Sequence, residues 1–504
     1  MLAAINSAAV LGIEAYDVTV EVDCAFGLPQ WFIVGLPAGS VRESRERVGA
    51  ALVNSGFRVP PRRITTNLAP ADVRKDGTAF DLPIALGILA ANGQVPVERL
   101  GELVVVGELG LDGSVRAVRG ALPVARRVAA SGGRMLVLPM QNVAEASLVS
   151  SVRLAAPATL AELVEWLRKG EELPRAREHS RPRAMESPLD LADVAGQRSA
   201  RRAMEVAAAG AHNMLMIGPP GAGKTMLARR LPGILPALEE EEALQVTAIQ
   251  SVAGLLTSGS VLISERPFRA PHHTISEAGL IGGGNPPRPG EVSLAHNGVL
   301  FLDELLEFRR HVIEGLRQPM EDGSVIIARA GGSVAFPARF ALVGAMNPCP
   351  CGQAGDPTRR CTCAASEIAR YRSRLSGPMA DRIDLHVHVG RIPVSELVAR
   401  RASHEGSACV RERVQRAREK QRLRYARVPN VTCNAHAPAR VESEAMLIAS
   451  EAVRLLADAA ERLGFTARAY HRVLRVARTI ADLDGDRAVS EPHVAEALRY
   501  RPVL

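Results

Sequence analysis

Four of the chain's seven cysteines fall within eighteen consecutive positions, in the stretch MNPCPCGQAGDPTRRCTC. They form two C-x-C pairs separated by nine residues, Cys349 and Cys351, then Cys361 and Cys363. Four thiolates this close in a Gly/Pro/Asp loop suit a tetrahedral Zn²⁺ site, although C-x₂-C is the commoner spacing. Free thiols or a redox switch are the alternatives. A structural disulfide is disfavoured, because the cysteines do not spread along the chain as a secreted framework would.

A second stretch, NMLMIGPPGAGKTMLARRL, has the spacing of a phosphate-binding loop: Gly218, four residues, then Gly223, Lys224 and Thr225. Glycines let backbone N–H groups turn inward around a phosphate, and a following helix adds its positive dipole end. Lys224 would reach the β- and γ-phosphates, and Thr225 would bind Mg²⁺. The predicted nucleotide-binding set is Gly218, Pro219, Pro220, Gly221, Ala222, Gly223, Lys224, Thr225 and Met226.

Two further apolar runs end in polar residues that suit phosphate chemistry. GVLFLDE predicts a buried strand followed by Asp303, which would hold Mg²⁺, and Glu304, which would orient and deprotonate the attacking water. Taken alone, this pattern is equally typical of a strand that ends in a solvated acidic turn. RFALVGAMN predicts a neighbouring strand that ends at Asn347. Its amide could fix the water and the γ-phosphate, although Asn at a strand end is commonly a turn former.

The motifs lie in the middle of a chain that divides into blocks. Residues 1–168 alternate apolar runs with Gly/Pro turns and predict a mixed α+β domain, and residues 169–188 are charge-dense and predict a linker. Residues 189–395 alternate helices and apolar strands around the motifs, and 396–504 predict helices. The elements expected are strands at 18–26 and 134–139, a hairpin at 103–118, and helices at 80–93, 409–426 and 442–503.

The composition excludes some classes of protein. The 504 residues are 47% hydrophobic and 23% charged, a globular balance. No apolar run approaches the ~20 residues of a membrane span, and the N-terminus is a poor signal peptide, so we expect a cytoplasmic protein with no membrane partner. The net charge of +8 suits a polyanion, although general arginine richness explains it equally well. Only 3% of residues are aromatic, so nucleic acid would be held through phosphates rather than by base stacking.

Four longer motifs resemble one known group. GPPGAGKTMLA, APHHTISEAGLIGGGNPPRPGEVSLAHNGVLFLDEL, AMNPCPCG and RLSGPMADRIDLHV are similar to the magnesium-chelatase-like AAA+ ATPases of the YifB/ComM family. The resemblance implies an α/β P-loop AAA+ module, an N-terminal α+β domain similar to the Lon-protease C-terminal (S5-like) fold, and a C-terminal helical lid. It also implies a homo-hexameric helicase that uses ATP and Mg²⁺ to drive branch migration of DNA in recombination and natural transformation. Recombination or DNA-uptake proteins would be further partners.

The resemblance supports the roles given above for Lys224, Thr225, Asp303, Glu304 and Asn347. It adds Arg382, in DRID, as an arginine finger that reaches the ATP of a neighbouring subunit. An ion pair with Asp381 or Asp384 within the subunit is the alternative. It also adds Arg468 as a second sensor on the lid, for which the alternative is an ordinary arginine on a helix surface.

Two insertions interrupt the module. EDGSVIIARAGGSVAFPARF (321–340) predicts strand, turn, strand. The resemblance makes it a hairpin that points into the pore of a ring, with Arg329 near its tip as a candidate DNA contact. The Gly/Pro-rich segment 270–290 predicts an exposed loop or hairpin. On a strand, its adjacent His272 and His273 would face opposite ways, which favours a structural or DNA-facing role over metal binding.

Some family-like activities lack their residues. A Lon-type protease would need a serine near 75–83 and a lysine near 119–127; neither is there, so we predict no peptide hydrolysis. Nothing indicates a porphyrin site for chelation. A protein remodeller is the main alternative to a DNA motor, although the hairpin tip ARAGG lacks the aromatic residue such motors use to grip polypeptide. A nucleotide-gated scaffold is a third class. The cysteine loop would brace the segment between Asn347 and Arg382.

Overall fold

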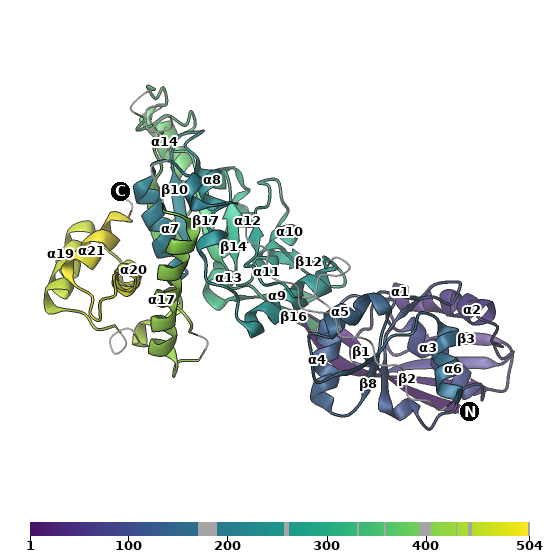
Figure 1. Cartoon of the computed structure of the whole chain (residues 1–504). Coiled ribbons are helices and arrows are strands. Elements are labelled where there is room, and N and C mark those ends of the chain that lie inside the picture. The colour runs from purple at the N-terminus through teal and green to yellow at the C-terminus, as the bar shows by residue number, and fades with distance from the viewer. Residues whose placement is uncertain are drawn as a thin grey trace.

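A computed structural model describes residues 1–169, 189–256, 262–329, 332–356, 359–392, 405–429, 431–441 and 446–501. The predicted linker 169–188 lies outside the described residues, apart from Lys169, which ends helix α6. Figure 1 shows three parts in a row: an N-terminal domain built on one sheet, a central part with a parallel sheet, and a group of C-terminal helices. None of the helices in these ranges is long and apolar enough to cross a bilayer.

The N-terminal domain is built on a mixed seven-stranded sheet with the order β3-β4-β2-β1-β5-β8-β9. Alternate side chains of β2 are buried, and every residue of α3 is buried because the segment DLPIALGILAA has almost no polar residue. Gly87 lets α3 approach β2, since a Cβ there would lie 2.6 Å from Cγ2 of Val22. The strands are β1 Leu2–Leu11, β2 Glu14–Ala25, β3 Gln30–Val34, β4 Arg63–Ala69, β5 Leu103–Val105, β8 Met135–Val137 and β9 Arg153–Ala155; the helices are α1 Gly39–Arg42, α2 Ser44–Asn54, α3 Asp81–Ala91, α4 Ala121–Ser131, α5 Val143–Ala146 and α6 Leu160–Lys169.

Most elements predicted for this domain are confirmed, and one is wrong in extent. The strands at 18–26 and 134–139 and the helix at 80–93 are present as β2, β8 and α3. The hairpin predicted at 103–118 is limited to β6 Glu108–Leu109 and β7 Val115–Arg116. Its first part is β5, which pairs in parallel with β1 and β8 of the main sheet. The predicted turn is present between β6 and β7, but the apolar run before it pairs with strands distant in the sequence, which shortens the hairpin.

The central part contains a five-stranded sheet with the order β11-β14-β17-β10-β18, in which every neighbouring pair is parallel. Its apolar strands are largely buried, as expected where helices cover both faces. Because the strands run the same way, the loops after β10, β14 and β17 leave from one edge. The strands are β10 Met214–Ile217, β11 Phe268–Arg269, β14 Val299–Leu302, β17 Ala341–Met346 and β18 Leu385–His388.

Both insertions form small hairpins beside this sheet. The strand–turn–strand predicted at 321–340 is confirmed as β15 Ser324–Arg329 and β16 Gly332–Pro337, with one apolar face packed in the core. The side chain of Arg329 lies outside the described residues. The segment 270–290 contains a hairpin of β12 Gly282–Gly283 and β13 Arg288–Pro289. Helices of the central part are α7 Arg198–Gly210, α8 Lys224–Ala228, α9 Glu240–Ala253, α10 Glu277–Ile281, α11 Glu291–Leu294, α12 Arg310–Glu314, α13 Arg317–Asp322, α14 Ala365–Arg372 and α15 Gly377–Ala380.

The C-terminal part consists mainly of helices in the residues that are described. Helices α17 and α20 pack against α7, so one apolar core joins this part to β10 and its neighbours. A buried ion-pair network strengthens it: Asp482, which is fully buried, accepts hydrogen bonds from Arg424 and Arg478. The predicted helices at 409–426 and 442–503 are confirmed as α17 Ser407–Tyr425, α19 Ser450–Leu463, α20 Ala467–Asp484 and α21 Glu491–Arg499.

Among the described residues, the N-terminal domain touches the central part around α9 and at the β15–β16 hairpin. At the first, apolar side chains of α4 and α5 pack against α9, where Ser251 donates a hydrogen bond to the buried carboxylate of Glu145. At the second, the turn between β1 and β2 meets the β15–β16 hairpin; a Cβ on Gly12 would lie 2.8 Å from the carbonyl oxygen of Ala335. In Figure 1 the N-terminal domain lies on the side of the central part away from the C-terminal helices.

Candidate nucleotide site and neighbouring clusters

The loop between β10 and α8 has the backbone of a phosphate cradle. Gly221 and Gly223 have φ values of 77° and 90°, in the left-handed region that favours glycine. Gly218 is needed for close approach, because a Cβ there would lie 2.0 Å from the carbonyl oxygen of Val389, just after β18. The strand–loop–helix context that the sequence predicts is therefore present.

Lys224 is the first residue of α8, and its ammonium group is buried inside the loop. Its Nζ donates hydrogen bonds to the carbonyl oxygens of Gly218 (2.6 Å) and Pro219 (3.0 Å) and to Oδ1 of Asn347 (3.2 Å). Burial lowers the pKa of Lys224, and the carboxylates that follow β14 oppose that shift. Since β17 pairs directly with β10, Asn347 stands where it can contact the same phosphate as Lys224.

The two carboxylates after β14 lie on the other side of the loop. Oγ1 of Thr225 donates a hydrogen bond to Oδ2 of Asp303 at 2.6 Å. A hydroxyl and a carboxylate placed together are the oxygen ligands that Mg²⁺ takes in nucleotide sites, so this donor set fits Mg²⁺ bound with ATP. Glu304 is left-handed, with φ 50° and ψ 47°, a conformation that is strained for a non-glycine residue and clusters at functional sites. Its side chain is 58% exposed and therefore in reach of solvent water.

These groups surround one cavity of about 460 Å³. Its size and its mixture of backbone amides, one cation and two carboxylates suit the triphosphate of a nucleotide with its metal. The structure thus brings together most of the predicted site. The lining residues are Pro220, Gly221, Ala222, Gly223, Lys224, Thr225, Met226, Asp303, Glu304, Ala345, Met346 and Asn347.

Two predicted site residues lie elsewhere. Arg382 and Arg468 line a second cavity of about 630 Å³ that shares no lining residue with the first. Arg468 is exposed on α20, whereas Arg382 is 5% exposed and forms an ion pair with Glu321. The alternative pairing of Arg382 with Asp381 or Asp384 does not describe this arrangement, because the carboxylate it meets comes from α13. The roles of Arg382 and Arg468 stay predictions.

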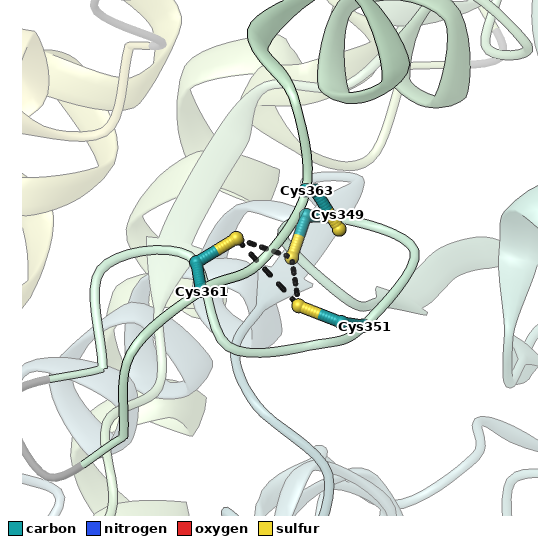
Figure 2. A group of neighbouring side chains, drawn as sticks. All are labelled: Cys349, Cys351, Cys361 and Cys363. Carbon is teal, nitrogen blue, oxygen red and sulfur yellow. Dashed lines mark hydrogen bonds between the residues drawn. The ribbon is translucent and has the colours of Figure 1, made fainter.

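The four clustered cysteines converge although two of them are ten or more residues from the others. The sulfur of Cys349 lies 3.4 Å from that of Cys351 and 3.7 Å from that of Cys361, and the latter two are 3.6 Å apart (Figure 2). All four sulfurs lie within 4.8 Å of one another. Backbone N–H groups of Thr362 and Gln353 lower the pKa of Cys351 to about 6, which favours its thiolate at neutral pH.

Comparison with known proteins agrees with this arrangement. The family described as magnesium chelatase, subunit ChlI, matches residues 190–397, and further ChlI families match 20–142 and 404–501. The chain is 45% identical to the competence protein ComM of Haemophilus influenzae, with all of this chain and 98% of that protein covered. It belongs to the magnesium-chelatase-like YifB/ComM family of AAA+ ATPases.

Other relatives mark how far the likeness extends. The uncharacterized protein YifB of Salmonella typhimurium is 42% identical over all of this chain and 97% of its own length. The magnesium-chelatase 38 kDa subunit of Cereibacter sphaeroides is 27% identical, and the match covers 32% of this chain and 54% of that subunit. The YifB/ComM likeness therefore covers the whole chain, whereas the chelatase subunit matches part of it.

This YifB/ComM-family site has a neighbour that sequence reasoning misjudged. Nδ1 of His273 lies 3.5 Å from Oε2 of Glu304, within ion-pair distance when the imidazole is protonated. The expectation that His272 and His273 face opposite ways is wrong, because the segment is not a strand and the two rings lie side by side, tilted by 34°, with centroids 4.1 Å apart. The adjacent histidines in the motif APHHT were the available signal, but their distance in sequence from Glu304 hid the contact.

We expect the variant His273→Ala to lower kcat for ATP hydrolysis roughly two- to fivefold, the rate equivalent of a partly exposed contact worth at most about 1 kcal/mol. Without the imidazole ring of His273, the Glu304 carboxylate must be ordered from a larger set of rotamers before it can take a proton. The affinity for ATP should not change, since His273 does not line the cavity. Steady-state kinetics would check this, with the exposed His311→Ala on α12 as control; an unchanged kcat in His273→Ala would show that the contact does not orient Glu304.

Gln197 is a second residue that the sequence did not reveal. Its Nε2 donates hydrogen bonds to the carbonyl oxygens of Ala222 in the P-loop (3.2 Å) and of Gly390 after β18 (2.7 Å). Gln197 itself is left-handed, with φ 50°. It therefore ties the phosphate loop to the segment that leads from β18 towards the C-terminal helices. A lone glutamine before a helix carries no sequence signal of this role.

Proposed function

We propose that this protein is a ring-forming, ATP-driven DNA motor, a branch-migration helicase of homologous recombination and natural transformation. The observation that supports assembly into a ring is that Arg382 and Arg468 line a cavity separate from the P-loop cavity. An arginine finger can be supplied in trans, and we propose that Arg382 serves the ATP of a neighbouring subunit, which a closed ring supplies at every interface. By analogy with its family, the ring is a homo-hexamer.

The residues of this chain divide the hydrolysis reaction among them. Lys224 binds phosphate oxygens, and Thr225 with Asp303 holds the cation. Glu304 takes the proton of the attacking water, which Asn347 helps to position, and Arg382 of a neighbouring subunit contacts the transferred phosphoryl group. Bound ATP with Mg²⁺ supplies the phosphoanhydride bond and the positive charge that neutralises its oxygens.

The choice of DNA as substrate is supported by three observations. A full-length relative is named a competence protein, and competence is the uptake of DNA. The net charge of +8 suits phosphate contacts. The β15–β16 hairpin is present as the family resemblance predicts, and we propose it as the pore element, with Arg329 as its candidate contact. Recombination or DNA-uptake proteins are the further partners, and the cytoplasm is the expected location. The proposal also includes an S5-like N-terminal domain that lacks protease residues and a C-terminal helical lid.

The experiment that tests this proposal compares ATP hydrolysis with no DNA, with linear duplex and with a four-way junction of the same sequence. We expect the junction to stimulate turnover most and to be converted into branch-migrated products in the presence of ATP. Raising the salt concentration should weaken stimulation, because phosphate contacts release counterions. If the junction neither stimulates hydrolysis nor moves, the motor acts on something other than DNA, and a protein-remodelling ATPase takes its place.

A further inference from the structure

The cysteine loop lies directly against the phosphate loop. A Cβ on Gly352, between the two cysteine pairs, would lie 2.6 Å from Cδ of Pro220, and the nearest atom of the Asn347 amide group is 3.9 Å away. The same loop starts two residues after Asn347, which directly follows β17 and lines the nucleotide cavity. Its other side is fastened by an ion pair of 2.8 Å between Asp356 and Arg391, beyond β18. The loop thus spans the edge of the sheet from which the P-loop leaves.

The sulfur geometry distinguishes a single metal ion from the alternatives. Sulfurs about 2.3 Å from a tetrahedral Zn²⁺ stand about 3.8 Å apart, close to the 3.4–3.7 Å observed among Cys349, Cys351 and Cys361. A disulfide would need an S–S distance of about 2.05 Å. A disulfide also joins only two sulfurs, so it cannot account for three that are all close to one another. In an iron–sulfur cluster the thiolates bind different irons and stand further apart.

We propose that Cys349, Cys351, Cys361 and Cys363 bind one Zn²⁺, and that this ion holds Gly352 against Pro220 and so sets the affinity of the P-loop for ATP. Binding leaves all four cysteines as zinc-bound thiolates and releases to solvent one proton from each cysteine that was still a thiol, with no change of oxidation state. The segment between Met346 and Ala365 has no helix or strand among its described residues. A loop without a core of its own keeps its shape when a metal closes it.

The first measurement is the metal content of the purified full-length protein. We expect about one zinc per chain by elemental analysis, lost in Cys351→Ser and Cys361→Ser and retained in Cys409→Ser, an exposed cysteine of α17 that serves as control. Co²⁺ in place of zinc should give the visible absorption of a tetrahedral thiolate site. Protein without metal whose four thiols all react with a thiol reagent would overturn the site.

The second measurement is the Kd of a non-hydrolysable ATP analogue. Removing zinc with a chelator should weaken binding about tenfold or more, since a displaced loop cannot align its amides on the phosphates, and adding zinc back should restore it. Gly352→Ala should weaken binding while zinc is retained, because its methyl group meets Pro220. Gly355→Ala is the matched control: its φ is also 78°, but nothing lies within 4 Å of the added Cβ. Equal affinities in all these states would overturn the coupling.

The inference rests on the ATP site of the proposed function, but not on DNA. Metal content and analogue binding are measured without DNA and without turnover. A motor that moves junctions but contains no zinc would disprove this inference and leave the proposed function standing. A zinc-dependent ATP site that ignores junctions would do the reverse.

Discussion

Replacing Glu304 with Gln is expected to lower ATP turnover by about 100-fold or more, the usual cost of losing a general base, while ATP still binds. Glutamine keeps the size of the residue but cannot accept the proton of the attacking water. The phosphate and cation contacts of Lys224, Thr225 and Asp303 remain, so affinity for the nucleotide should change little. Phosphate release and binding of a fluorescent ATP analogue, measured on one preparation, would separate the two effects.

The control for this variant is Glu307→Gln, three residues further along the chain. Glu307 pairs with Arg374 at 3.2 Å, and both side chains are about half exposed, so the pair contributes little to stability. Turnover in Glu307→Gln should match that of the unmodified protein. If Glu304→Gln retains most of its activity, the proton of the water must go to another group.

Replacing Arg382 with Lys is expected to lower turnover on the order of 1,000-fold, the scale of an arginine finger, without weakening ATP binding. Lysine keeps the charge but lacks the planar fork that contacts two oxygens at once. It also leaves Glu321 with a cationic partner, so the fold should persist. Because Arg382 lines a cavity separate from the P-loop, the loss should appear in kcat rather than in the nucleotide Kd.

Mixing two inactive proteins tests whether Arg382 acts across a subunit interface. A Glu304→Gln subunit has an intact Arg382, and an Arg382→Lys subunit has an intact Glu304. In mixed rings some interfaces combine the two intact residues, and activity should return above the sum of the separate proteins. If Arg382 instead only stabilises its own subunit through Glu321, mixing restores nothing, and Glu321→Gln reproduces the loss.

The sequence was sufficient to predict site residues where they lie in one continuous motif. The spacing of the phosphate-binding loop identifies Lys224, and an apolar strand followed by a polar residue identifies Asp303 and Asn347. The parallel order of β14, β17 and β10 then brings their side chains to one edge. The positive φ of Gly221 and Gly223 was likewise implied by the loop, since only glycine takes that backbone without cost.

The sequence was insufficient where a contact joins distant segments. The partner of Arg382 is Glu321, sixty-one residues earlier, and a local search of DRID could find only its neighbouring aspartates. His273 meets Glu304 because a turn, rather than a strand, carries it there. The placement of Arg468 beside Arg382 depends on how α20 packs against α7, which no local pattern encodes.

The two contacts of the N-terminal domain have a mechanical consequence. One is made with α9 and the other with the β15–β16 hairpin, yet both belong to a single domain built on one sheet. If the β15–β16 hairpin moves relative to α9, either the whole N-terminal domain must tilt or one of the two contacts must break. A molecule that binds the outer surface of the N-terminal domain would therefore resist movement of the hairpin relative to α9. If the proposed motor uses that movement, the domain would slow it without contributing a residue to the nucleotide cavity.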